Sequence, residues 1–162
     1  MQRRTWGEGA GAPAMDPPVP TPAPGATAPS PQVLRCIALL DDKDAGVRFS
    51  AAIELGKLGE RAAWQALAKR LKTDEDPFVR RACARSIGEL KAYDAFPELI
   101  DALMDGEEYV AIQSSRVIKE MAGDDFGFKQ NQAKSDRKKV ADRAKKWWEQ
   151  NKDRLAPGAR GG

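Results

Sequence analysis

The stretch Asp76–Leu90, DPFVRRACARSIGEL, decides the fold of this chain. Asp76 is a residue type that caps helix N-termini, and Pro77 suits the first helical position. Apolar side chains then recur at helical spacing, at Val79, Cys83, Ile87 and Leu90. The stretch is therefore predicted to be an amphipathic helix with one buried face.

The same plan occurs at Asp44–Leu58, DAGVRFSAAIELGKL, and in a less regular form at Glu107–Met121, EEYVAIQSSRVIKEM. Val47 lies 32 residues before Val79, and Val110 lies 31 residues after it. A shorter apolar helix is predicted before each copy, and its leucines also recur at 32 residues: Leu39, Leu71 and Leu103. A period of this length in paired helices is typical of a solenoid.

We therefore expect an all-α fold, a short α-solenoid of about three helix pairs with a C-terminal capping helix. The expected repeats are residues 32–59, 60–91 and 92–123. Residues 124–155 are expected to form a loop and a basic helix, in which Trp147 and Trp148 cover the apolar end of the stack.

These units resemble HEAT repeats, most closely the phycobilisome-lyase-like subtype. The resemblance rests mainly on Asp44, Val47, Arg48 and Gly56, and on Asp76, Val79, Arg80 and Gly88. It implies that the arginines pair with acidic residues of neighbouring units. The aspartates are expected to cap helices and the glycines to permit close helix packing. The third copy departs from the pattern, with Ala111 in place of the arginine and Lys119 in place of the glycine.

A binding surface, if present, is expected on the outward positions of the inner helices, which line the concave face of resembling solenoids. The register places six residues there: Phe49, Ile53, Arg81, Arg85, Ile112 and Arg116. Exposed apolar groups beside arginine favour a protein partner. An ordinary solvated face is the alternative interpretation.

The composition excludes several kinds of chemistry. The chain has no histidine, which removes the commonest general base and metal ligand and, with them, Ser-His-Asp and Cys-His mechanisms. Its two cysteines follow no zinc or disulfide spacing, and a net charge of +3 is too small to indicate nucleic-acid binding. We expect no catalytic residues, no metal site and no cofactor.

The two ends of the chain differ from the repeats. Residues 1–31 are rich in Pro, Ala and Gly and are predicted to be disordered, as are residues 156–162. Whether the N-terminal arm is a ligand for a partner domain, a plain tail or a misassigned start stays open. No apolar leader follows Arg4, so a cytoplasmic protein without membrane spans is expected.

The leading hypothesis is a non-enzymatic, monomeric scaffold that binds another protein. A nucleic-acid-binding module is the first alternative, through Arg81, Arg85, Arg116 and the final helix, which has nine basic and four acidic residues between Lys134 and Arg154. The resemblance supplies the second alternative, an accessory subunit similar to bilin lyases.

Overall fold

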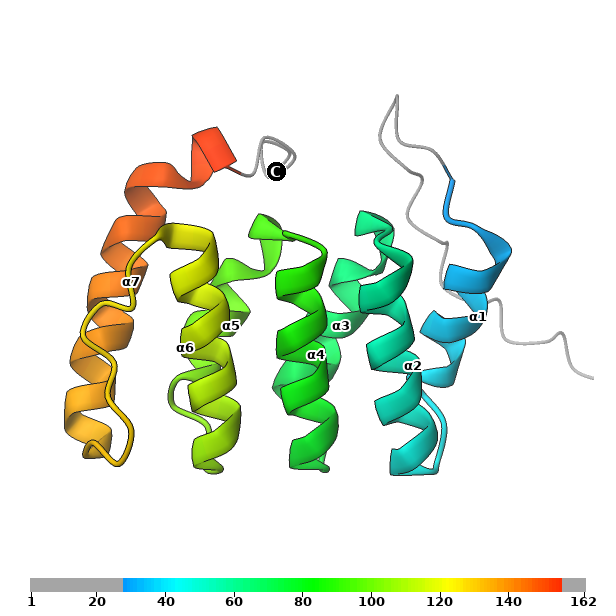
Figure 1. Cartoon of the computed structure of the whole chain (residues 1–162), viewed down its shortest axis with the longest axis horizontal. Helices are drawn as coiled ribbons and strands as arrows, with labels where there is room; N and C mark the ends of the chain where they lie inside the picture. The colour runs from blue at the N-terminus through cyan, green and yellow to red at the C-terminus, as the bar shows by residue number, and fades with distance from the viewer. Residues whose placement is uncertain (1–27, 156–162) are drawn as a thin grey trace, which may run out of the picture.

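The computed structural model describes residues 28–155, which form three consecutive helix pairs followed by a seventh helix (Figure 1). The helices are α1 (Pro31–Leu39), α2 (Ala45–Leu58), α3 (Trp64–Thr73), α4 (Pro77–Glu89), α5 (Phe96–Ala102), α6 (Glu108–Ala122) and α7 (Lys134–Leu155). Short 3₁₀ turns, Arg61–Ala63 and Tyr93–Ala95, lead into α3 and α5. The described residues contain no strand, and the predicted all-α solenoid is confirmed.

The helix pairs form two layers. Helices α2, α4 and α6 stand side by side as the inner layer, and α1, α3 and α5 lie behind them (Figure 1). Each inner helix packs on its own outer helix, and α4 also packs on both of the other inner helices. One hydrophobic core therefore runs through all three repeats, with these large side chains fully buried: Val33, Leu55, Leu67, Val79, Ile87, Leu99, Val110 and Ile118.

The helix ends follow the predicted local signals. The side chains of Asp44 and Asp76 each accept hydrogen bonds from the backbone N–H groups two and three residues further on. At the other end, α2 and α6 stop at Gly59 and Gly123, whose φ angles of +71° and +81° are left-handed. Glycine adopts this conformation without the steric cost of a Cβ atom.

The predicted N-terminal boundary is corrected by the structure. Helix α1 begins at Pro31, and Ser30 caps it by accepting a hydrogen bond from the Val33 N–H at 3.3 Å. The Ser30 N–H donates in turn to the Glu60 carboxylate at 2.9 Å. The expectations for residues 1–27 and 156–162 lie outside the described residues.

Two glycines allow the inner helices to approach closely, as predicted. A Cβ atom on Gly88 would lie 2.9 Å from a Val117 methyl carbon of α6. A Cβ atom on Gly56 would lie 2.9 Å from the Ser86 Cβ of α4. Since neighbouring carbon atoms do not approach this closely, a side chain at either position would force the helices apart.

Helix α7 covers the C-terminal end of the stack. Trp148 stacks on Phe96 at a ring-centroid distance of 5.1 Å, and Trp147 is tilted against the same ring at 5.3 Å. Trp148 is buried, while Trp147 is half-buried. The predicted role of both tryptophans as a cap is therefore seen in the structure. None of the helices within residues 28–155 combines the length and apolar character that a bilayer crossing requires.

Candidate functional site

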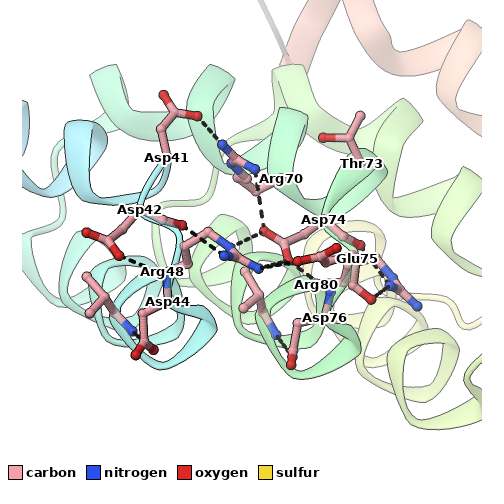
Figure 2. Close-up of polar contacts among 12 residues, drawn as sticks. Asp41, Asp42, Asp44, Arg48, Arg70, Thr73, Asp74, Glu75, Asp76 and Arg80 are labelled. Atoms are coloured by element: carbon pink, nitrogen blue, oxygen red, sulfur yellow. Dashed lines mark hydrogen bonds and ion pairs between the residues drawn. The ribbon is translucent and has the colours of Figure 1, made fainter.

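A buried ion pair joins the first two repeats (Figure 2). Arg48 donates to both carboxylate oxygens of Asp74, from Nε at 2.9 Å and from Nη2 at 3.0 Å. Its Nη1 donates to the Asp42 carbonyl at 2.8 Å. The Asp74 side chain is fully buried, and its hydrogen bonds raise the pKa of the Arg48 guanidinium above its ordinary value. Arg48 therefore ties its own turn to the turn of the next repeat.

Arg80 repeats this arrangement one unit further along. It donates to both oxygens of Asp105, from Nε at 2.8 Å and from Nη2 at 2.9 Å, and its Nη1 donates to the Asp74 carbonyl at 2.8 Å. The pairing of arginines with acidic residues of neighbouring units, which the resemblance implies, is therefore present. We call these two arginine–aspartate pairs, Arg48–Asp74 and Arg80–Asp105, the arginine ladder. Its acidic partners were not identified from the sequence, although an aspartate stands two residues before the capping position in every repeat.

A groove of about 480 Å³ crosses the inner layer from α2 to α6. Five of the six residues predicted for a binding surface line it, and it brings them together from three helices: Phe49, Ile53, Arg81, Arg85 and Arg116. The prediction missed several other lining residues, among them Phe78, Ala82, Gln113 and Val117.

Ile112, the sixth predicted residue, is half-buried on α6 and does not line the groove, so its place in a binding surface stays a prediction. Its equivalents Phe49 and Arg81 lie on the sides of α2 and α4 that face the next inner helix. Within the described residues no inner helix follows α6, so this helix contributes the side that faces α4 instead. That side presents Gln113 and Val117.

The groove combines unpaired positive charge with exposed aromatic surface. Arg85 forms an ion pair with Glu89 at 2.9 Å, whereas Arg81 and Arg116 have no carboxylate within ion-pair distance among residues 28–155. Phe78 is 57% exposed and stacks on Tyr109 with ring centroids 5.3 Å apart. The arrangement is suited to a ligand that supplies carboxylates and apolar side chains together.

The chemically reactive groups of the described region are few. Cys36 and Cys83 are both buried and free, and burial raises the pKa of both thiols. Both are therefore protonated at neutral pH, a state in which cysteine is a poor nucleophile. Residues 28–155 hold no cluster of acidic or cysteine side chains suited to a metal ion.

Two family models match parts of this chain. A profile of HEAT repeats matches residues 28–88, and a profile of the PBS lyase HEAT-like repeat matches residues 79–105. The solved complex of CpcE and CpcF of phycocyanin lyase from Nostoc sp. PCC7120 is similar, with 29% sequence identity and a TM-score of 0.53. The match covers 64% of this chain and 42% of that chain, so this chain spans less than half of it. No curated protein matches the sequence.

Proposed function

Because this chain is a HEAT-repeat protein whose units are similar to PBS lyase HEAT-like repeats, we propose that it is a non-enzymatic scaffold that binds another protein in its inner groove. The observation that carries the proposal is the groove itself. It gathers Phe49 and Phe78, from two of three neighbouring helices, beside Arg81 and Arg116, which have no ion-pair partner within residues 28–155. Interfaces are enriched in these residue types.

The polar groups of the groove indicate the character of the partner. Glu89 compensates Arg85, and Glu120 adds a second carboxylate to the lining, so the excess positive charge is small. A nucleic acid would meet both carboxylates along its phosphate backbone, which is unfavourable. An acidic protein segment with one or two aromatic side chains satisfies Arg81 and Arg116 and covers the exposed rings. We therefore favour a protein partner over a nucleic acid.

The test is capture from a nuclease-treated lysate of the source cells, comparing the full-length chain with the Arg81→Glu, Arg116→Glu variant. Charge reversal at two groove positions should repel the acidic partner and reduce its capture by ~10-fold or more. The control is Lys69→Glu, Lys72→Glu, which makes the same charge change on exposed positions of the outer helix α3. Equal loss in both variants, or no loss in the groove variant, would contradict the proposal.

A second candidate function follows from the similarity to the phycocyanin lyase complex. A role as an accessory subunit in chromophore attachment would require a chromophore or chromophore-bearing protein among the captured partners. The visible absorbance of the captured material distinguishes the two functions. A colourless partner favours the general scaffold, and a bilin spectrum favours the accessory subunit.

A further inference from the structure

The two ends of the solenoid are built differently. Helix α7 covers the C-terminal end, whereas no described residue covers the outer faces of α1 and α2 at the N-terminal end (Figure 1). The difference is visible in the exposure of the leucine that recurs in the outer helices. Leu71 and Leu103 are 2% and 1% exposed, but their equivalent Leu39 is 38% exposed. A position that is buried between repeats is therefore open in the first repeat.

The first inner helix shows the same difference. Val79 and Ala82 of α4 are buried against the preceding repeat, while their equivalents on α2 are the half-buried Val47 and the exposed Ser50. A shallow groove of about 540 Å³ runs between α1 and α2 at this end, and Leu39, Val47 and Ser50 help to line it. The surface has the composition and shape of an interface between repeats.

The arginine ladder also stops one step short here. Asp74 and Asp105 each accept a hydrogen bond from the N–H two residues further on, and each receives two more from an arginine of the preceding repeat. Asp42 accepts the corresponding bond from the Asp44 N–H at 2.8 Å. Among residues 28–155, no arginine or lysine lies within ion-pair distance of its carboxylate.

We propose that the N-terminal end of the solenoid is a docking surface for a helical repeat of a second protein, whose inner-helix arginine pairs with Asp42. The incoming repeat would cover Leu39 and Val47 with its own apolar side chains, as α1 and α2 cover their neighbours. It would donate two hydrogen bonds to the Asp42 carboxylate in the geometry that Arg48 makes with Asp74. The interface would thus extend the contacts already present between repeats.

Charge and sequence distinguish this partner from two other occupants. A second copy of the chain cannot add head to tail, because α7 covers its C-terminal end and Ala111 stands where the third repeat would carry its arginine. Residues 1–27 include six prolines between Pro13 and Pro24. This segment is also shorter than the 32 residues of one repeat and holds no further copy of the repeat sequence.

The test uses a photoreactive side chain at the open end. The full-length chain with Ser50→benzoylphenylalanine is irradiated in a lysate of the source cells, and adducts are identified by mass spectrometry. We expect an adduct with a protein that contains helical repeats carrying an arginine near the start of the inner helix. Asp42→Asn should lower the adduct yield by ~10-fold or more, since it removes one member of a buried charge pair.

Two controls accompany this experiment. Asp41→Asn makes the same charge change on a carboxylate that already pairs with Arg70 of the same chain, and it should leave the yield unchanged. A variant with a second copy of residues 60–91 inserted between residues 27 and 28 should form no adduct with another protein, because the attached repeat covers position 50. In the chain without the insertion, an adduct within the same chain, with a second copy or with a protein lacking repeats would overturn the proposal. A yield independent of Asp42 or the absence of any adduct would overturn it too.

Discussion

At the scale of single residues, the arginine–aspartate pairs connect one repeat to the next. Each arginine satisfies two carbonyls of its own turn and both oxygens of an aspartate in the following turn. The first pair is the more buried, since the side chain of Asp74 is 0% exposed and that of Asp105 is 10% exposed. Breaking a buried pair leaves its partner charge without compensation, which costs more than the pair itself contributes.

We therefore predict that Asp74→Ala lowers the free energy of unfolding by about 3 kcal/mol, because the buried Arg48 would lose the carboxylate that accepts two of its hydrogen bonds. Asp105→Ala should cost roughly 2 kcal/mol, since water can reach the Arg80 guanidinium. Urea unfolding followed by circular dichroism measures both values. The explanation fails if the two variants lose equal stability or if Asp105→Ala loses more.

At the scale of helices, a single glycine sets the spacing between α4 and α6. A Cβ atom at Gly88 would meet two methyl carbons of Val117, at 2.9 and 3.0 Å. Alanine is the better helix former by about 1 kcal/mol, so local propensity and packing oppose each other at this position. The packing contact is the larger effect because neither helix backbone can move without disturbing the core.

Gly88→Ala should consequently lower the free energy of unfolding by about 1–2 kcal/mol, despite its gain in helix propensity. Adding Val117→Ala makes room for the new methyl group, so a double-mutant cycle between the two positions should give a favourable coupling energy of about 1 kcal/mol. Thermal and urea unfolding of the four proteins measure this coupling. Additive effects would show that the close contact does not limit the spacing.

At the scale of the whole molecule, the solenoid has one closed and one open end. Stability in such stacks is approximately a sum of repeat and nearest-neighbour contributions. The closed end has its apolar surface under Trp148, while the open end leaves Leu39 38% exposed and the Asp42 carboxylate without an ion-pair partner among the described residues. Adding a repeat to the open end should therefore raise the free energy of unfolding by the contribution of one further interface between repeats.

The variant with residues 60–91 inserted before residue 28 tests this directly, because the insertion continues the 32-residue register. It should unfold at a higher urea concentration than the natural chain. Asp42→Asn should cost about 3 kcal/mol in the extended chain, where Asp42 is paired and buried. The same substitution in the natural chain should change stability by less than about 0.5 kcal/mol. Equal effects in both chains would show that the open end does not continue the ladder.

The sequence by itself determined the helix pairs, their order and most of their ends. Helical spacing of apolar residues, capping aspartates and stop glycines are all signals between residues a few positions apart, and each was confirmed in place. Five of the six residues that the repeat register predicted for a binding surface line the groove, because equivalent positions on stacked helices lie on the same surface.

Only the tertiary structure decided which sides of the helices form the groove, which acids pair with the arginines and which end is open. These features depend on contacts between residues 25 or more positions apart, such as Arg80 with Asp105. Ile112 shows most clearly where the repeat register fails to predict which residues line the groove. Its place in the register is equivalent to that of Arg81, but a helix at the end of a layer has a neighbour on only one side. Periodicity describes what successive repeats share, and the number of neighbours is what differs between the middle of a stack and its ends.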